Sequence, residues 1–123
     1  MKLKLPIALS LFMIEIIIKK YLDGHLDVPS FFEHEAEAPD SFVIIQKTGG
    51  KERNHSGSAT FAFQSYGPTM QKAAELNLKV KKAVKGLIEL DEICGVHLNS
   101  DYNFTDTETK QYRYQAVFDI NYF

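Results

Sequence analysis

Apolar and polar residues alternate with a period of two along the last part of the chain, residues 112–122. One set consists of Tyr112, Tyr114, Ala116, Phe118, Ile120 and Tyr122, and the other of Arg113, Gln115, Val117, Asp119 and Asn121. Neighbouring side chains of a β-strand point to opposite faces, so this pattern predicts a strand. We expect the first set to face the core and the second to face water or a partner.

Four upstream segments also have strand patterns. Residues 26–35 contain Pro29, which cannot donate to a ladder, so an edge strand is expected there. Residues 42–46 are apolar at consecutive positions, which is typical of a strand covered on both faces. A short strand is expected at residues 93–99. In residues 58–66 the two predicted faces carry Ala59, Phe61 and Phe63 on one side and Thr60, Ala62 and Gln64 on the other.

Two helices are predicted from apolar spacing and from signals at the helix ends. The first covers the apolar run from Ile7 to Ile18, with Pro6 in its first turn and Gly24 just past its end. The second opens at Gly67-Pro68 and has one apolar stripe at helical spacing. The members of this stripe are Met70, Ala73, Leu76, Val80, Ala83, Val84 and Leu87.

The predicted order of elements is helix, three strands, helix and two strands. This order indicates an α+β fold with an N-terminal helix and an antiparallel or mixed sheet of four to five strands. One long helix between the third and fourth strands is expected to pack on one face of the sheet. A length of 123 residues fits one domain, which we expect to span residues 1–123.

Charge and cysteine content narrow the classes of protein. The net charge of −2 creates no overall field that favours nucleic acid or an anionic membrane. The single cysteine, Cys94, excludes an internal disulfide, and we expect it to pack as a small apolar residue in a reducing compartment. A signal peptide is an alternative for the N-terminal run, but Glu15 interrupts the run and Lys19 follows where small residues should be. The run is also shorter than the ~20 apolar residues that span a bilayer.

Side chains that could support catalysis are scattered along the sequence. The four histidines fall in four segments, and no pair has the i, i+4 spacing of a helical metal site. Thr48-Gly49-Gly50-Lys51 lacks the full spacing of a phosphate-binding loop, and Ser56 lacks the flanking glycines of a nucleophile elbow. We therefore expect no catalytic, metal or cofactor site and no enzymatic activity. The aromatic residues leave a single-strand nucleic-acid or peptide binding module as an alternative.

Several segments together resemble the small tail-terminator or tail-completion (head–tail joining) proteins of long-tailed, non-contractile bacteriophages. The strongest of them is Gln46-Lys47-Thr48-Gly49-Gly50, which ends a proline-led segment that starts at Pro39. The resemblance covers nearly the whole chain. Its other segments are Val28-Pro29-Ser30-Phe31-Phe32-Glu33, Ala73-Ala74-Glu75 and Tyr112-Arg113-Tyr114-Gln115-Ala116-Val117.

This resemblance implies a structural, non-enzymatic protein of the virion, made in the cytoplasm of the host bacterium. Such proteins form a ring, commonly a hexamer, at the head-proximal end of the tail tube, where they stop tube polymerisation. The implied partners are further copies of the chain, the tail tube protein and the head–tail connector or head-closure protein. DNA only passes through the lumen, and no membrane is contacted. Another neck component, such as a head-closure protein, is the alternative within a phage.

The resemblance carries no invariant chemistry, so its implied assembly contacts fall in the predicted loops. Residues 48–58 form a polar loop, in which a Gly-Gly pair predicts a tight turn with left-handed glycines. The candidate contacts in this loop are Thr48, Gly49, Gly50, Lys51 and Arg53. Residues 101–110 form a second polar region, where Tyr102 and Phe104 are candidate anchors. Arg113 is a candidate for pairing with an acid on the next strand or subunit. A solvated loop and local hairpin packing are the alternative interpretations.

Overall fold

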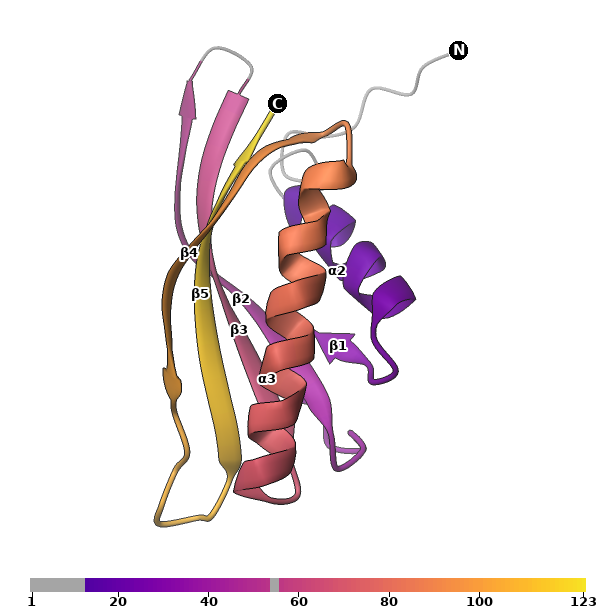
Figure 1. Cartoon of the computed structure of the whole chain (residues 1–123), viewed down its shortest axis with the longest axis vertical. Coiled ribbons are helices and arrows are strands. Elements are labelled where there is room, and N and C mark those ends of the chain that lie inside the picture. The colour runs from indigo at the N-terminus through magenta and orange to yellow at the C-terminus, as the bar shows by residue number, and fades with distance from the viewer. Residues whose placement is uncertain (1–12, 54–55) are drawn as a thin grey trace.

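The computed structural model describes residues 13–53 and 56–123, and it has the predicted α+β fold (Figure 1). The elements are α2 (Met13–His25), β1 (Ser30–Phe31), β2 (Phe42–Arg53), β3 (Ser56–Gly67), α3 (Met70–Lys85), the 3₁₀ helix η1 (Gly86–Glu89), β4 (Ile93–Asn103) and β5 (Tyr112–Tyr122). An N-terminal helix, a mixed sheet and a long helix between β3 and β4 confirm the predicted architecture.

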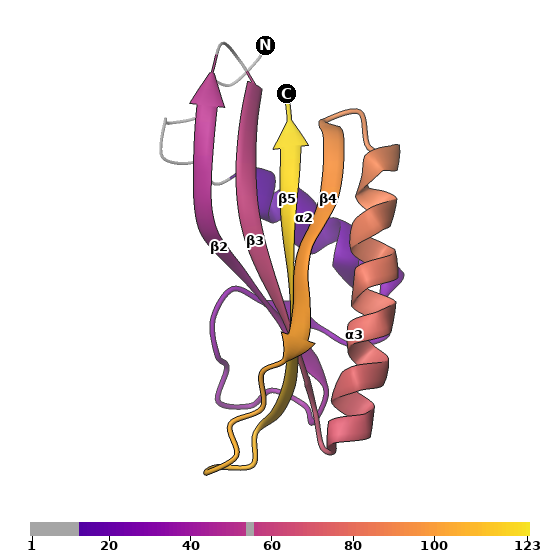
Figure 2. The ribbon, with the colours of Figure 1, turned by 60° about the vertical axis from the view of Figure 1, so that its left-hand side comes forward.

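The five strands form one sheet in the order β1-β2-β3-β5-β4. β1 pairs in parallel with β2, and the other three pairings are antiparallel, so the four long strands lie side by side (Figure 2). The strand expected at residues 26–35 is reduced to two residues, although its edge position is confirmed. Pro29 contributes only its carbonyl, which accepts a hydrogen bond of 3.0 Å from the backbone N of Val43.

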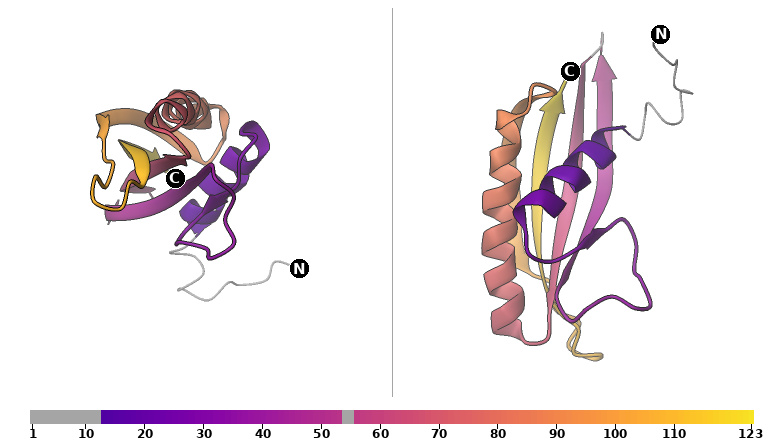
Figure 3. Two further views of the ribbon diagram at one scale, coloured as in Figure 1. Left: turned by 90° about the horizontal axis from the view of Figure 1, so that it is seen from below. Right: turned by 90° about the vertical axis from the view of Figure 1, so that its right-hand side faces the viewer.

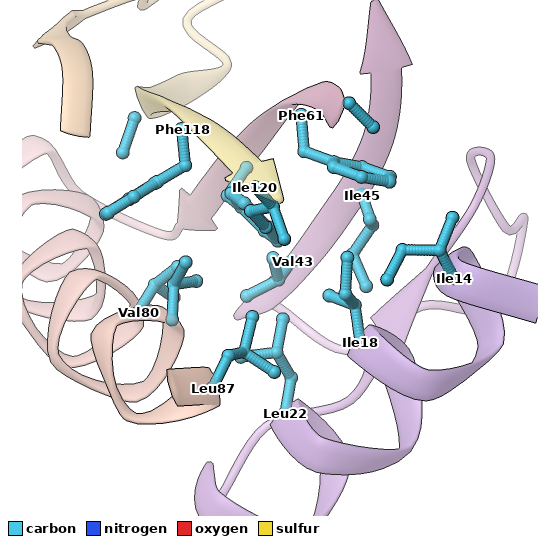
Figure 4. Close-up of a cluster of buried hydrophobic side chains, with 14 of the residues drawn as sticks. Ile14, Ile18, Leu22, Val43, Ile45, Phe61, Val80, Leu87, Phe118 and Ile120 are labelled. Carbon is cyan, nitrogen blue, oxygen red and sulfur yellow. The ribbon is translucent and has the colours of Figure 1, made fainter. Parts of the chain in front are cut away.

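The core lies between the sheet and the two helices, which pack on the same face (Figure 3). Alternation along the strands directs Phe61, Phe63 and Phe118 to this face, where all three are fully buried. Burying each such side chain contributes roughly 1.5–3 kcal/mol before conformational entropy is counted. The residues labelled in Figure 4 show how strands and helices meet there: Ile14, Ile18, Leu22, Val43, Ile45, Phe61, Val80, Leu87, Phe118 and Ile120.

The helix α3 carries most of its predicted stripe. Thr69 is the N-cap and accepts a hydrogen bond of 3.1 Å from the backbone N of Lys72, so the helix begins after Pro68 rather than with it. Met70 is exposed, while Ala73, Leu76, Val80 and Val84 are buried. Asn77 is also buried in the stripe, because its amide reaches across to β4.

The helix α2 continues further than the sequence pattern indicated. Gly24 was expected just past the helix end, but it lies inside the last turn, so this prediction was wrong. The start of the predicted helix, from Pro6 to residue 12, lies outside the described residues. Ile14, Ile18 and Leu22, spaced four residues apart, are buried against the sheet. The described part therefore docks one face of α2 on the core.

The prediction of a polar loop at residues 48–58 is wrong. The backbone from Gly49 to Arg53 pairs with Ser56 to Thr60, so β2 and β3 form a long hairpin. No glycine among the described residues has a positive φ, which also contradicts the predicted Gly-Gly turn. The sequence is polar here because this end of the hairpin, which we call the arm (residues 48–53 and 56–60), extends past the helices (Figure 1).

The strand β4 is also longer than predicted, since it runs to Asn103 instead of ending at residue 99. Tyr102 therefore belongs to a strand rather than to a polar turn. The register shifts between Ile93 and Gly95 and again between Leu98 and Ser100, so β4 has two irregularities. The prediction that Cys94 is packed in the core is wrong, because Cys94 lies at the first irregularity and is exposed.

Candidate assembly surface

The sheet face opposite α2 and α3 carries rows of residues that cross the four long strands. One row joins Ile44, Gln64, Gln115 and Tyr102, and the next joins Phe42, Tyr66 and Arg113. Nearer the arm, the rows hold small and polar residues, including Thr60, Ala62, Asp119, His97 and Ser100. We call this surface the polar face.

Two glutamines form the centre of the polar face. Nε2 of Gln64 donates a hydrogen bond of 2.8 Å to Oε1 of Gln115, and Gln115 in turn donates to the hydroxyl of Tyr102. The hydroxyl of Tyr66 donates to Oε1 of Gln64 at 3.5 Å. Both glutamines are only 9% exposed, so each amide is buried with its hydrogen bonds made inside the protein. This network fixes the positions of the two tyrosines.

Arg113 connects this network to the turn between β4 and β5. Its Nε donates a hydrogen bond of 2.7 Å to the backbone O of Phe104, and its Nη1 donates to the hydroxyl of Tyr66 at 3.1 Å. The guanidinium lies 4.5 Å from the centroid of the Phe104 ring, which is a cation–π distance. The rings of Tyr102 and Phe104 meet edge to face at 5.8 Å. We call Tyr66, Tyr102, Phe104 and Arg113 the aromatic corner.

The aromatic corner contains three of the eight predicted contact residues, Tyr102, Phe104 and Arg113. Tyr102 and Phe104 remain 42% and 38% exposed, respectively. A rigid aromatic pair backed by an arginine is the composition found at interface hot spots. The alternative interpretation, local packing within the hairpin, accounts for the contact between Arg113 and Phe104. It does not account for the exposed surface of the Tyr102 and Phe104 rings.

Two further rings, Phe42 at the start of β2 and His34 in the segment before it, pack on Tyr66 of the aromatic corner. The rings of Phe42 and Tyr66 stack with centroids 4.6 Å apart. His34 contacts both rings edge on, and its Nε2 lies 3.2 Å from the hydroxyl of Tyr66. Four of the exposed residues around His34 are acidic: Glu33, Glu35, Glu37 and Asp40. We call residues 33–40 the acidic loop.

The other five predicted contact residues lie on the arm. The hydroxyl of Thr48 donates to the backbone O of Thr60 at 3.3 Å, at the register shift between Lys47 and Gly49. Before this irregularity the even-numbered residues of β2 lie on the polar face, and after it the odd-numbered residues do. The exposed Lys51, which pairs with Ser58, therefore lies on the polar face. Gly49 pairs with Thr60, and Arg53 pairs through its backbone with Ser56.

Gly50 has a packing role on the helix side of the arm. A Cβ atom at Gly50 would come within 3.0 Å of Cε of Lys47, because the lysine side chain crosses this position. Nζ of Lys47 lies 3.8 Å from Oε1 of Glu15 on α2. Glu15 is only 5% exposed, and this burial raises the pKa of its carboxyl while Lys47 partly offsets the effect. This ion pair ties β2 to α2 at the residue just before the arm.

The predicted contacts therefore fall into two groups at opposite ends of the sheet (Figure 1). Between them, Asp119 accepts hydrogen bonds from Thr60 at 2.7 Å and from Asn99 at 3.1 Å. These bonds lower the pKa of the Asp119 carboxyl.

The sequence did not reveal His34 and Tyr66 as part of this surface. The only available signal was the two-residue period of the strands, which does not reveal contacts between distant segments.

Both lateral edges of the sheet are open among the described residues. β4 is the last strand on one side, and no described strand pairs with its outer edge. On the other side, β1 pairs only with Val43 and Ile44, which leaves the outer edge of β2 from Gln46 to Arg53 without a described partner. Open edges present backbone donors and acceptors that favour pairing with another strand.

A groove of about 530 Å³ lies on the helix side of the molecule. The rings of Tyr21 and His25 stack in it at 3.9 Å. Partial burial raises the pKa of Tyr21, and the neighbouring Glu89 carboxylate raises it further. Across residues 13–53 and 56–123, no group of three His, Cys, Asp or Glu side chains could hold a metal ion. Within the same residues, no helix is long and apolar enough to cross a membrane.

No protein-family model matches this chain, and no curated protein matches it. The polar face, the aromatic corner and the two open edges have the chemistry of a protein–protein contact surface.

Proposed function

We propose that this chain is a structural protein that forms a ring at the head-proximal end of a phage tail tube. The observation that carries the proposal is the pair of open edges on opposite sides of one antiparallel array, β2-β3-β5-β4. Together with the segments that resemble tail-terminator proteins, this feature favours assembly of many identical copies.

The strand directions make such an assembly possible. Each of the three pairings in the array is antiparallel, so β2 and β4 run in opposite directions. Placed edge to edge, β4 of one copy and β2 of the next would continue the antiparallel pattern. A head-to-tail contact of this kind closes into a ring when its rotation divides a full turn. Closure also pairs both edges, which otherwise promote aggregation.

The irregularities of β4 limit this pairing to part of the strand. Between Ser100 and Asn103 the register is regular, whereas the shifts nearer Ile93 interrupt the ladder. Bulges on an edge strand discourage indiscriminate pairing. An edge with one regular stretch suits a specific partner, which here is the next copy in the ring.

In the proposed role, the ring of six copies stops polymerisation of the tail tube and joins the tail to the head. Its axial partners are the tail tube protein and the connector or head-closure protein. DNA passes through the lumen without being held there, in keeping with a chain of net charge −2. The protein acts in the virion, after synthesis in the host cytoplasm, and its role is structural rather than catalytic.

The decisive experiment is electron microscopy of lysates from the phage that encodes this chain, with the gene stopped early. Overlong or headless tails are the expected result. Tails of normal length beside unattached filled heads would instead assign the chain to another step of neck completion. Ordinary infectious particles would contradict both roles. The purified protein would then be tested for binding to single-stranded oligonucleotides and extended peptides.

A further inference from the structure

We infer that the groove between α2 and α3 binds a nucleotide unit, with its base stacked on His25 and its phosphate bound by Lys79 and Lys82. The groove lies where α2 passes beside α3 (Figure 3). The nucleotide can be free or part of a single strand, because both offer the same ring and the same phosphate. The proposed function gives the helix side of the protein no ligand, so this site adds a second role and does not depend on the first.

A stacked pair of rings forms part of the groove lining. The rings of Tyr21 and His25 lie 3.9 Å apart, with an angle of 17° between their planes. Nδ1 of His25 donates a hydrogen bond of 2.7 Å to the backbone O of Tyr21, which fixes the orientation of the imidazole. His25 is exposed, so its ring has surface left for another flat group. Aromatic rings presented in this way are the surfaces on which bases stack in single-strand binders.

Gly86 makes room for this pair of rings. Its backbone is right-handed helical with φ −68°, a conformation that any residue adopts, and glycine there is less stable than alanine. A Cβ atom at Gly86 would overlap the hydroxyl of Tyr21. The same hydroxyl is hydrogen-bonded to the carboxylate of Glu89. The ring beneath His25 is therefore fixed before a ligand arrives, which lowers the entropy cost of binding.

The helix α3 supplies unpaired positive charge to the groove. Five of its sixteen residues are lysine and one is acidic. Lys72 and Lys81 form ion pairs, whereas no ion pair among the described residues includes Lys79, Lys82 or Lys85. Lys79 and Lys82 are three residues apart, hence neighbours on one helix face, and both line the groove. Two unpaired ammonium groups side by side favour a phosphate group.

The size and the remaining lining of the groove also fit a nucleotide. Its volume of about 530 Å³ falls within the ~300–1,000 Å³ that is usual for small-molecule sites. Leu26 and Ala83 add apolar surface to the lining. Asp27, also in the lining, can accept a hydrogen bond from the amino group of a base. Ring, phosphate and amino group thus each have a matching side chain.

The C-terminal end of α2 does not stand in the way of a phosphate. Bare carbonyl groups at a helix C-terminus carry partial negative charge and repel anions. Here the backbone O of Tyr21 accepts a hydrogen bond from His25, and the O of Leu22 accepts one of 2.9 Å from the N of Leu26. These carbonyl groups are therefore occupied within the protein.

Titrations of the isotope-labelled full-length protein, followed by NMR, test this site. The probes are deoxyadenosine monophosphate and a single strand of about twelve deoxyadenosines, with inorganic phosphate for comparison. At least one of the two nucleotide probes should shift the backbone amides of residues 21–27 and 79–86 more than inorganic phosphate does. Binding of the monophosphate identifies a free nucleotide as the source, and binding of the strand alone identifies nucleic acid. No shift with either probe at millimolar concentration, or equal shifts with inorganic phosphate, would overturn the inference.

Paired lysine substitutions test the phosphate contact. Lys79→Gln combined with Lys82→Gln should raise the Kd of the bound probe about fivefold or more. The matched control combines Lys51→Gln with Lys110→Gln, two exposed lysines outside the groove lining. It removes the same charge and should leave the Kd nearly unchanged. Equal losses in the two double variants would overturn the site, because they would show attraction to the overall charge alone.

Two substitutions at His25 test the stacking contact separately from charge. His25→Ala should raise the Kd about fivefold or more, whereas His25→Phe keeps a flat ring and should retain most of the binding. Unchanged binding by His25→Ala would overturn the stacking of a base at this position. Both variants are checked by circular dichroism, and His25 is exposed at the end of α2, so the fold should persist in each. The tail role is read from the lysates instead, so the two proposals fail independently.

Discussion

Gln64 and Gln115 are joined by a hydrogen bond of 2.8 Å on the sheet face opposite the helices, and each is only 9% exposed. Their remaining amide groups bond to the hydroxyls of Tyr66 and Tyr102. Buried amides in a sheet cost free energy unless every polar atom finds a partner. The pair therefore specifies how the aromatic corner is arranged, rather than adding bulk to the core.

The first prediction concerns this pair. Gln64→Leu or Gln115→Leu alone should lower the free energy of unfolding by about 1–3 kcal/mol, because the other amide is left buried without its partner. The double substitution should cost less than the sum of the two single substitutions. Urea unfolding of the four proteins measures the coupling. Strictly additive losses would contradict a direct interaction between the two side chains.

A second prediction follows from the close approach of β3 to the start of α3. A Cβ atom at Gly67 would lie 2.7 Å from the backbone N of Ala73 and 3.0 Å from the backbone C of Lys72. Because helix backbone cannot move aside as a flexible side chain can, Gly67→Ala should destabilise the protein by about 1–3 kcal/mol.

Gly24→Ala is the matched control for this substitution. Gly24 lies in the last turn of α2, and a Cβ atom there would meet nothing within 4 Å. This change should be neutral or should raise the free energy of unfolding by up to about 1 kcal/mol, since alanine favours helix more than glycine does. Thermal unfolding of both variants provides the comparison. Equal effects would show that α3 does not pack tightly on Gly67.

The order of the elements could be predicted from the sequence because long segments keep one period. The alternation around Phe118 and the stripe around Val80 each repeat often enough to exclude other structures. The arm could not be predicted in this way. Gly49, Gly50 and Lys51 have turn composition, and their strand conformation depends on pairing with Thr60, Ala59 and Ser58, which a local pattern does not reveal.

The candidate site was predictable only in part for a similar reason. Tyr102, Phe104 and Arg113 were found as aromatic and charged residues in a polar region, and the structure brings them together. Tyr66 and His34, however, come from segments far apart in the sequence, and their contact depends on the fold. The facing of Lys51 depends on one register shift, and no residue type marks that position uniquely.

A third prediction tests the solvent exposure of the polar face. Asp119→Ile removes the acceptor for Thr60 and Asn99 and adds an apolar branched side chain next to Val117. The fold should persist with a loss of about 1–2 kcal/mol, while light scattering should show increased aggregation because an apolar patch is extended. Asp119→Asn is the control and should remain soluble. Loss of the native circular dichroism spectrum in Asp119→Ile would show that this position needs a polar side chain to fold.

A fourth prediction concerns acid stability through Asp101. Partial burial opposes ionisation of Asp101, but hydrogen bonds from Lys81 and Asn77 outweigh it and lower the pKa of the carboxyl. A lowered pKa in the folded state means that Asp101 stabilises the protein above the pKa of the unfolded chain. This contribution is lost as pH falls through the folded pKa, so the decline starts at about pH 4.

Asp101→Asn should therefore flatten the acid limb of the stability profile. Urea unfolding at several pH values between about 2 and 7 measures this slope. Asp91→Asn, in an exposed turn, is the control and should leave the slope unchanged. If the free energy of unfolding of Asp101→Asn falls as steeply with pH as that of the unsubstituted protein, the link between α3 and β4 does not depend on the ionised carboxylate.

The last prediction concerns Glu15, whose pKa is shifted in the opposite direction to that of Asp101. Its effect on stability therefore has the opposite dependence on pH. Burial raises the pKa of its carboxyl, and Lys47 offsets only part of that effect. A raised folded pKa means that the protonated form is favoured in the native state, so stability is lost as pH rises through that pKa. Glu15→Gln keeps the shape and removes the charge. It should raise the free energy of unfolding near pH 7 by roughly 1 kcal/mol, and this gain should shrink toward pH 4.

Lys47→Met should lower the free energy of unfolding at pH 7, since it leaves the buried carboxylate without its cation. Glu37→Gln in the acidic loop is the control and should change little. A Glu15→Gln variant that is less stable at both pH values would show that the carboxylate at the base of the arm is needed for its geometry and that its buried charge is not the dominant cost.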